Sequence, residues 1–594
     1  MPSVSEERVL IIGAGPAGLM AAYDLALHGI KSIVFEKSHV VGGIARTEQY
    51  RGFHFDMGGH RFFTKSTEVR QRWVEILGEE FLRRPRLSRI YFKKRFFNYP
   101  LKPWNTLWGL GPFESMLILA SYVRWRLFPH RPENTFEEWV VNRFGRRLFR
   151  LFFKAYTEKV WGIPCSELSA EWAAQRIKDL SLKAAVVSMF VKPRKTVTTL
   201  IEEFDYPRRG PGMMWNAARQ RIEGEGGSVR LNSDVLEIRR ESARIQSVLV
   251  NRDGQQEVVE GSDFISSMPI TEFIKKLHPP PPPNVLEAAG KLRYRDFLTV
   301  CLVVNHPDLF PDNWIYIHDP KVKVGRIQNF KNWSPDMVPD QTKTSLGLEY
   351  FCTEGDELWR APDADLIELG KRELERLGLA RMLDVEDGCV FRVARSYPMY
   401  DGTYREHLAV VKDFVNGLEN FQTIGRNGLH RYNNQDHAML TGMLAVRNLV
   451  LGERNDLWNV NTEQAYHEEI DAAEEEIRES VQAALAEAFR KFDPVALGAS
   501  IGTVAGALLM AATLFLVAMG GPTVSPHLEL LNQYFPAYSI TAPGSLVGLA
   551  YGFLTGFAGG WSFAFVRNAA VLLFAGSAQR RIECDLLQKL LLSI

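Results

Sequence analysis

The chain is poor in cysteine, and no two of its cysteines lie close together. The five are Cys165, Cys301, Cys352, Cys389 and Cys584, and none forms a CxxC motif with another. An odd number of isolated cysteines argues against a disulfide scaffold and against a zinc site, and it fits a reducing compartment. A basic segment ahead of the first apolar run is also missing, so no secretory signal is expected.

An excess of charge of either sign is missing as well. Lysine and arginine together number 71, and aspartate and glutamate 70, which leaves a net charge of +1. No basic tail of the kind that binds nucleic acid is present. With 46% apolar and 24% charged residues over 594 positions, the composition is that of a folded protein of about two to four domains.

Charge is absent from two long runs near the C-terminus, 494–519 and 543–566. Each exceeds the roughly 20 residues that cross a bilayer, and both are rich in glycine and alanine, as closely packed membrane helices are. The loop between the runs contains no basic residue. Basic residues flank the pair on its outer sides: Arg490, Lys491, Arg567, Arg580 and Arg581. This distribution predicts a two-span hairpin in the inner or plasma membrane, with the body of the protein in the cytoplasm. Two buried core helices are the alternative.

The segment VLIIGAGPAGLMAAYDLALHGIKSIVFEK predicts a dinucleotide-binding unit. An apolar strand leads into Gly13, Gly15 and Gly18, a helical pattern follows, and a second strand ends at Glu36. Gly13 permits the tight turn, Gly15 lets the backbone approach a pyrophosphate, and Gly18 lets the helix pack on the strand. The helix N-terminus offers N–H groups to the phosphates, and the Glu36 carboxylate accepts hydrogen bonds from a ribose diol.

The next block, KSHVVGGIARTEQYRGFHFDMGGHRFF, indicates which dinucleotide binds. It resembles the FAD-binding start of the amine-oxidase superfamily, so FAD is favoured over NAD. The resemblance implies cofactor contacts from six residues, the first three at the pyrophosphate and the last three at the isoalloxazine: Gly42, Gly43, Arg46, Gly58, Gly59 and His60. A histidine packed on a loop is the alternative for His60.

Residues 425–440, GRNGLHRYNNQDHAML, are rich in hydrogen-bonding side chains and run into an apolar helical pattern. FAD proteins of this type close the cofactor site with a C-terminal segment, and we expect Gly425, Arg426 and Gln435 to contribute to it here. The helix that follows can point its positive N-terminus at the flavin, where it would stabilise an anionic reduced ring. An ordinary polar loop is the alternative.

Several stretches, taken in order, resemble UDP-galactopyranose mutases, particularly the eukaryotic type. They are FDMGGHRFF, FNYPLKP, YTEKVWGIPCSELSAEWAAQRI, FDYPRRGPGMMW, WIYIHDPKVKVGR, RSYP and GRNGLHRYNNQDHAMLTGMLAV, and they span about residues 5–465. The resemblance implies an FAD-dependent nucleotide-sugar mutase of cell-envelope glycan biosynthesis. Its reaction is a pyranose/furanose isomerisation that begins with attack of N5 of the reduced flavin on the anomeric carbon, without net redox change. NAD(P)H is a candidate external reductant.

The same resemblance implies roles for individual residues. Arg176 and Arg326 match arginines that hold the diphosphate, for which the guanidinium fork is well suited, and with His60 they are the expected catalytic residues. The expected substrate-binding residues, the first two near the uridine and the others near the phosphates, are Tyr99, Trp161, Tyr316, Tyr397, Tyr432 and Asn434.

Alternatives exist for some of these positions. Trp161 is equally at home in a core, Arg176 on a solvated helix face, and Tyr400 can take the place of Tyr397. Lys102 stands where the family has a glutamine, so the sugar and its nucleotide or lipid carrier stay open.

The expected fold is α/β: a Rossmann-like FAD-binding domain, a helical subdomain, a mainly antiparallel sheet domain and a C-terminal two-helix transmembrane hairpin. The FAD domain is assembled from 5–65, 205–285 and 420–465. The substrate regions are helical over 66–204 and sheet over 286–419. A charged helical stalk, 466–493, leads to the hairpin region 494–594, whose tail is expected to be an amphipathic surface helix. No metal and no nucleic acid are expected, and the oligomeric state is open.

The main alternative function is a true FAD oxidoreductase of the amine-oxidase, protoporphyrinogen-oxidase or desaturase kind, because the same FAD motifs serve both. A mutase needs the arginine and tyrosine cluster, whereas an oxidase for apolar substrates needs an apolar pocket. A non-catalytic, FAD-containing membrane scaffold is a third reading of the same motifs.

Overall fold

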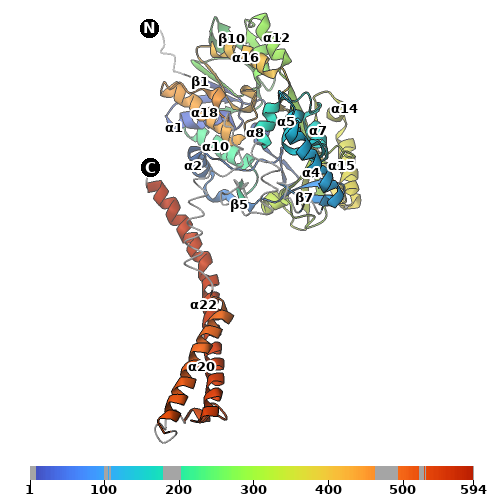
Figure 1. The fold of residues 1–594 in the computed structure, drawn as a ribbon. Coiled ribbons are helices and arrows are strands. Elements are labelled where there is room, and N and C mark those ends of the chain that lie inside the picture. Colours follow the sequence, from blue (N-terminus) through green and yellow to red (C-terminus); the bar gives the residue numbers. More distant parts are fainter. Residues whose placement is uncertain are drawn as a thin grey trace. The chain divides into compact units, whose positions relative to one another are not determined.

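The computed structural model describes residues 8–99, 105, 109–177, 203–461, 492–520, 528 and 530–592. The chain divides into two compact units, 1–471 and 472–594. The first is mixed α/β and the described part of the second is helical (Figure 1). The expected stalk falls outside the described residues except at Phe492 and Asp493.

A five-stranded parallel sheet carries the glycine-rich turn, in the strand order β20-β13-β1-β2-β9. Its strands are β1 (Val9–Ile12), β2 (Ser32–Phe35), β9 (Ser228–Arg230), β13 (Asp263–Ser266) and β20 (Phe421–Thr423). Every residue of β1 is buried, which explains why VLII reads as an unbroken apolar run rather than an alternating one. Stretches far apart in the sequence thus meet in one sheet.

Both faces of this sheet are covered. Val9 and Ile11 pack with helices α1 (Pro16–Leu27), α10 (Gly212–Gly224) and α18 (Gln435–Val450), which lie together in Figure 1. Leu10 and Ile12 pack on the opposite side, against a second sheet in the order β12-β11-β10-β14. That sheet and the helices beside it are β10 (Ser233–Glu241), β11 (Arg244–Arg252), β12 (Gln255–Glu260), β14 (Leu277–His278), α11 (Ile270–Lys276), α12 (Pro283–Lys291) and α16 (Tyr404–Asn416).

A seven-stranded sheet forms the other half of the body, in the order β19-β15-β18-β17-β16-β6-β7. All neighbours are antiparallel except β16 and β6, which run parallel. Its strands are β6 (Ser88–Phe92), β7 (Arg95–Asn98), β15 (Tyr294–Val304), β16 (Trp314–Ile317), β17 (Arg326–Asn329), β18 (Thr344–Cys352) and β19 (Val385–Pro398). Helix α15 (Asp363–Leu377) covers one face of this sheet.

The region 66–204, which we expected to be helical, is only partly so. Its helices are α2 (Thr67–Leu77), α4 (Pro112–Leu127), α5 (Phe136–Phe144), α6 (Arg146–Leu148), a π-helical segment (Phe149–Lys154), α7 (Ala155–Trp161) and α8 (Ala170–Ile177). It also supplies β5 (Phe81–Pro85), which pairs with β8 (Glu203–Pro207), and it supplies β6 and β7 to the large sheet. The expectation failed because these short strands acquire their partners from distant parts of the chain.

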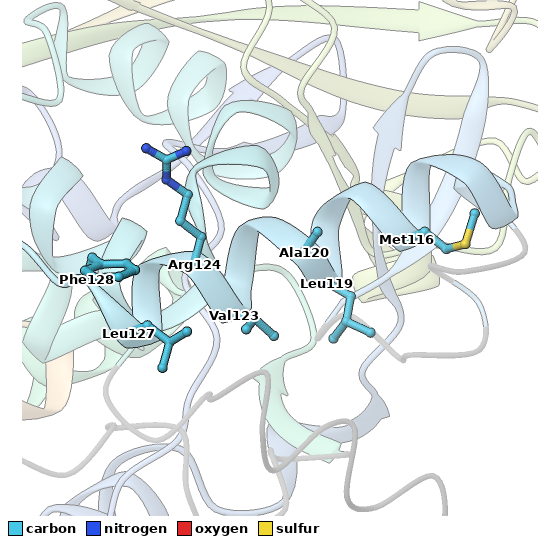
Figure 2. A pocket seen from close by; sticks show the side chains of 7 residues that line it. All are labelled: Met116, Leu119, Ala120, Val123, Arg124, Leu127 and Phe128. Atoms are coloured by element: carbon cyan, nitrogen blue, oxygen red, sulfur yellow. The ribbon is translucent and has the colours of Figure 1, made fainter.

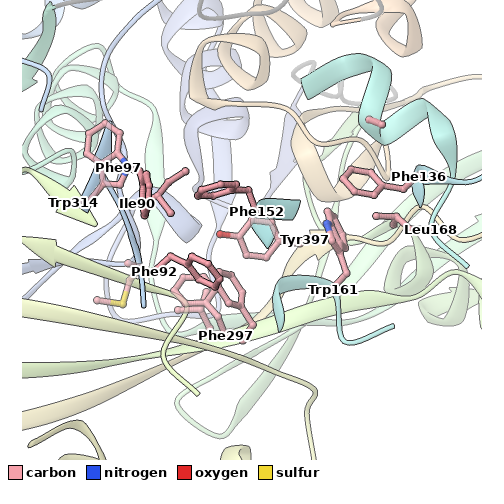
Figure 3. Close-up of a cluster of buried hydrophobic side chains, with 14 of the residues drawn as sticks. Ile90, Phe92, Phe97, Phe136, Phe152, Trp161, Leu168, Phe297, Trp314 and Tyr397 are labelled. Atoms are coloured by element: carbon pink, nitrogen blue, oxygen red, sulfur yellow. The ribbon is translucent and has the colours of Figure 1, made fainter. Parts of the chain in front are cut away.

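The main apolar core lies between the large sheet and these helices (Figure 3). The ring of Phe152, from the π-helical segment, lies 5.1 Å from Phe97 and 5.7 Å from Phe92, measured between centroids. Phe297 and Trp314 belong to the same core. The smaller elements of the body are β3 (Thr47–Tyr50), β4 (Phe53–Asp56), α13 (Phe330–Trp333), α14 (Glu357–Arg360) and α17 (Gly425–Gly428).

The second unit is an antiparallel pair of helices, α20 (Pro494–Ala518) and α22 (Ala542–Leu592). Glycines face one another across it: a Cβ on Gly552, Gly556 or Gly560 would lie within 3.0 Å of the Cα of Gly506, Gly502 or Gly498, respectively. Small residues at such a crossing let two helix backbones touch, which is how helices associate where the surroundings are apolar.

Two segments are long and apolar enough to cross a membrane, Pro494–Ala518 and Ala542–Ala569. Only 17% of the most apolar part of each segment is buried inside the structure, whereas the core helix of a soluble protein is mostly buried. The tail that we expected as an amphipathic surface helix is helical and continues α22 without a break as far as Leu592.

Candidate functional site

The glycine-rich turn between β1 and α1 is built for close backbone approach. A Cβ on Gly18 would lie 2.0 Å from the carbonyl oxygen of Gly13, so only glycine lets α1 pack on its strand. Gly15 sits just before α1 and faces Gly43, where an added Cβ would come within 3.1 Å of the Gly15 Cα. The two glycines leave a narrow gap at the helix N-terminus, which suits a phosphate group.

Glu36 lies directly after β2 and is held in place by the same turn. Its Oε2 accepts from the Ala14 N–H at 2.8 Å, and its Oε1 accepts from the Ser38 N–H at 2.9 Å. The side chain is buried, and each carboxylate oxygen can accept a further bond. These two hydrogen bonds fix the carboxylate at the edge of the turn, where the sequence predicts the ribose.

The predicted pyrophosphate side brings Gly42, Gly43 and Arg46 together. The Gly42 N–H donates to the Ala14 carbonyl at 2.8 Å, and Arg46 is fixed by Glu48 at 2.6 Å and the Gly43 carbonyl at 3.1 Å. Beside Gly42, the indole N–H of Trp215 is buried and finds no acceptor in the described part of the chain. A glycine-walled gap with an unmatched buried donor fits a dinucleotide such as FAD.

The loop expected at the isoalloxazine lies against Arg326, with the charge of Arg426 also nearby. Gly58 has φ +90°, and a Cβ there would lie 3.6 Å from the His60 ring and 3.7 Å from Arg326 Nη2; Gly59 lies against Trp333. His60 Nδ1 is 3.1 Å from the Gly58 carbonyl. Burial, with the charges of Arg426 and Arg326, lowers the pKa of His60 to about 3, so its ring is neutral.

The C-terminal segment closes over this loop from the N-terminus of α18. The Gln435 amide donates to the carbonyls of His60 at 3.4 Å and Arg61 at 3.2 Å. The amide oxygen of Gln435 is buried and has no donor among the described residues. Asn434 is the N-cap of α18, and its N–H lies 3.4 Å from His437 Nδ1.

Gly425 and Arg426 tie the segment to the rest of the site. The Gly425 N–H donates to Thr441 Oγ1 at 2.9 Å. Arg426 donates to the carbonyls of Asn433 at 2.8 Å and Ser396 at 3.1 Å. Its guanidinium lies 4.6 Å from the Tyr432 ring and 5.8 Å from the Tyr397 ring, so three predicted residues meet here.

A row of polar side chains crosses three strands of the large sheet. Tyr316 on β16 is paired with Arg326 on β17, which is paired with Glu349 on β18. Glu349 accepts from Arg326 Nε at 2.9 Å and Nη2 at 2.6 Å, and from Gln328 at 2.8 Å. Arg326 therefore has a buried counter-charge, and its Nη1 edge is not part of the pair.

Tyrosines surround this row. Measured between ring centroids, Tyr99 lies 5.0 Å and Tyr156 lies 5.6 Å from Tyr316. Tyr397 stacks on Tyr432 with the ring centroids 5.6 Å apart. Burial raises the pKa values of Tyr156 and Tyr397, partly offset by the charge of Arg326, so their hydroxyls stay protonated donors. The alternative Tyr400 is also close, because its hydroxyl accepts the Tyr432 N–H at 2.6 Å.

Trp161 borders this cluster on the side of the apolar core. Trp161 is only 2% exposed and packs on Trp172 at 4.8 Å and on Tyr397 at 6.3 Å, which is the environment of a core residue (Figure 3). Arg176 lies in α8, and its side chain is outside the part of the chain that the structure describes. Lys102 is outside it altogether.

The sequence reasoning missed Glu349, Gln328, Tyr156 and Lys159. Glu349 carried a usable signal, since it is the lone charge in TSLGLEYFC, a strand buried throughout. Lys159 on α7 donates to three carbonyls of the β16–β17 connection, at 2.9 to 3.2 Å, and so fixes the hairpin that carries Arg326. Tyr156 and Lys159 lie in the stretch YTEKVWGIPCSELSAEWAAQRI, but no role was expected for either of them.

The family described as flavin containing amine oxidoreductase matches residues 16–443. Among curated proteins, 15-cis-phytoene desaturase of Synechococcus elongatus is 25% identical over 285 residues, 44% of this chain and 58% of the desaturase. L-amino-acid oxidase of Sistrurus catenatus edwardsii is 33% identical over 135 residues, 20% of this chain and 26% of the oxidase. Protoporphyrinogen oxidase 2 of Arabidopsis thaliana is 35% identical over 94 residues, 16% of this chain and 18% of that protein. Each match spans less than two thirds of the relative's own length.

Solved structures extend the comparison to the whole body. Reduced UDP-galactopyranose mutase superposes with a TM-score of 0.67 at 22% identity, over 78% of this chain and 99% of that one. Putrescine oxidase bound to putrescine gives a TM-score of 0.51 at 17% identity, over 75% and 99%. At these identities the likeness establishes the fold, which is the mixed α/β fold of FAD-dependent oxidoreductases.

Proposed function

The chain belongs to the family of flavin containing amine oxidoreductases, and within it we propose that this protein is an FAD-dependent mutase that isomerises the sugar of a glycosyl diphosphate. One observation carries the proposal: Arg326, flanked in the sheet by Tyr316 and Glu349, lies against Gly58 in the loop expected to face the flavin ring. An enzyme that must hold a departing diphosphate beside its flavin needs a cation and hydroxyl donors at that place.

The residues around the loop suggest a division of labour. Reduced FAD, when bound, would supply the nucleophile for the anomeric carbon. Arg326 would hold the diphosphate through its Nη1 edge while Glu349 fixes its other edge. Tyr316, Tyr397 and Tyr432 would donate hydroxyl hydrogen bonds to phosphate oxygens. Neutral His60 would border the flavin without adding charge.

Arg426 and Gln435 would complete the cofactor side, and NAD(P)H is proposed as the external reductant. The likeness to reduced UDP-galactopyranose mutase supports this substrate class. Its fold matches that of this chain, and its name refers to the kind of UDP-sugar that the motifs of this chain led us to expect. Tyr99 is proposed at the nucleotide end, Asn434 at the phosphates and Arg176 as a second diphosphate arginine. We further propose that the α20–α22 unit anchors the enzyme in the inner or plasma membrane, with its body in the cytoplasm.

A true FAD oxidoreductase is the second candidate, and a specific observation favours it. Glu349 balances the charge of Arg326, and the tyrosine cluster continues into the apolar core. Such surroundings also suit an uncharged substrate that gives a hydride to the flavin. The desaturase and oxidases among the curated relatives agree with this candidate.

One experiment separates the two candidates. Detergent-purified, FAD-loaded protein is incubated with a panel of UDP-sugars and of lipid-linked glycosyl diphosphates, with and without dithionite. Products are analysed for isomers by chromatography and mass. A ring isomer that forms only after reduction supports the mutase. No isomer, together with stoichiometric flavin reduction by an uncharged substrate, would replace it with the oxidoreductase.

A further inference from the structure

Helix α4 carries a row of large apolar side chains on the protein surface. The exposed fractions are 69% for Phe113, 63% for Met116, 50% for Leu119, 48% for Val123 and 68% for Leu127. They recur every three or four residues and therefore share one face of the helix. Figure 2 shows Leu119, Val123 and Leu127 pointing to the same side while Arg124 points away. Leu383 is more exposed, at 94%, but it is an isolated residue.

The opposite side of α4 is fixed to the body. Glu114 forms an ion pair with Arg147, and Ser121 accepts the Arg147 N–H at 3.1 Å. A Cβ on Gly145 would lie 2.8 Å from the Tyr122 nitrogen, so the backbones are in contact. The outward direction of the apolar row is therefore a property of the folded body and not of a loosely attached helix.

Basic residues border the row at both ends. Lys93 and Lys94 form the exposed turn between β6 and β7. The hydrogen bond from Arg147 and, to a smaller extent, the charge of Lys93 lower the pKa of the Glu114 carboxyl. Beyond the middle of the helix the exposed residues include Arg124, Arg126 and Arg131. Glu114 is the lone acid between residues 112 and 132, and Arg147 neutralises it.

We propose that α4 is an interfacial helix whose apolar row enters the surface of a lipid bilayer that contains anionic lipid. An outward apolar row with cations at its borders matches a lipid boundary beneath negatively charged headgroups. A second copy of the chain fits less well, because a symmetric contact would bring two basic borders together. The inference needs the bilayer that we propose for the second unit, but it does not depend on which reaction the flavin site performs.

The test uses the full chain, loaded with FAD, in lipid nanodiscs. Cys389 and Cys584 are replaced by serine, since the other three cysteines are buried. A fluorophore is then attached at Leu119→Cys or, as the matched control, at Leu383→Cys. A quencher carried on the lipid acyl chains should quench the label at 119 and leave the label at 383 unchanged. The quenching should weaken in nanodiscs of neutral lipid and in high salt.

Two variants check that the apolar row causes the contact. Phe113→Asp combined with Leu127→Asp should reduce quenching at 119 to the level of the control site, whereas Leu383→Asp should not change it. Equal quenching at both sites in anionic nanodiscs would overturn the proposal. A second result would also overturn it: in detergent, the label at 119 becomes less accessible to aqueous iodide as the protein concentration rises. A second copy of the chain would then cover the row.

Discussion

Removing the negative charge of Glu349 should lower the stability of the folded protein and, at the same time, raise the affinity of the site for anions. The carboxylate has no exposed surface and accepts from Arg326 at 2.9 and 2.6 Å and from Gln328 at 2.8 Å. Glu349→Gln preserves the shape of the side chain but leaves the Arg326 guanidinium without its counter-charge.

The magnitude follows from burial. Breaking one partner of a buried ion pair costs roughly 3–5 kcal/mol, whereas an exposed pair contributes about 1 kcal/mol or less. Arg326 keeps 18% of its side chain exposed, so water offsets part of the loss. We therefore expect a destabilisation of about 3 kcal/mol. A bound diphosphate would return the missing negative charge, so UDP should stabilise the variant more than the wild type.

The assay is thermal release of flavin, followed by its fluorescence, with and without UDP. The double variant Arg326→Met/Glu349→Gln is the control: with neither charge left, it should recover part of the lost stability and lose the response to UDP. If Glu349→Gln melts with the wild type, the buried-charge reasoning is wrong. If it melts lower but UDP stabilises both proteins equally, Arg326 does not face the anion.

The remaining predictions concern the cofactor, turnover, the helix pair and pH. Gly15→Val should give folded protein without flavin absorbance, because the side chain fills the gap to the opposite glycine; retained flavin would contradict the assignment of the turn. Arg326→Ala should keep FAD and lose turnover, measured as flavin content beside product formation, whereas loss of FAD would show that this arginine is misplaced. Gly502→Leu should lower the thermal midpoint of the detergent-purified protein, because a Cβ there lies 2.6 Å from a carbonyl of α22; Gly559→Leu, with nothing within 4 Å, is the matched control. Burial raises the pKa of Asp56 from 3.8 to about 7, so the folded state binds a proton that the unfolded chain releases, and stability contributed by this group falls as the pH rises through that window. Asp56→Asn should remove this part of the difference between melting at about pH 5 and about pH 8, and an unchanged difference would refute it.

Local patterns predicted the parts of the site that are local in the chain. The turn from β1 through Gly13, Gly15 and Gly18 to Glu36 lies within one strand–helix–strand unit, so each residue meets a partner close in sequence. The start of α18 at Gln435 was readable for the same reason, because a polar stretch runs directly into an apolar helical pattern.

Tyr316 and Arg326 stand ten residues apart in the stretch WIYIHDPKVKVGR, and the sheet explains this spacing. The two residues face each other across the β16–β17 hairpin, so the distance along the chain fixes the register. What the sequence did not reveal is the next member of the row. Glu349 comes from β18, and its pairing with Arg326 exists because the two strands lie side by side.

The amino-acid sequence by itself determined the dinucleotide turn, the helix that closes it and two long uncharged helical runs. Strand, turn and helix preferences, and the length of an apolar run, depend on residues that are near neighbours in the chain. The tertiary structure decided that β6 and β7 join the large sheet, that Trp161 is buried, that Glu349 balances Arg326 and that the apolar row of α4 faces outward. These features depend on contacts between segments far apart in the chain, and such contacts become defined when the strands pair and the core packs.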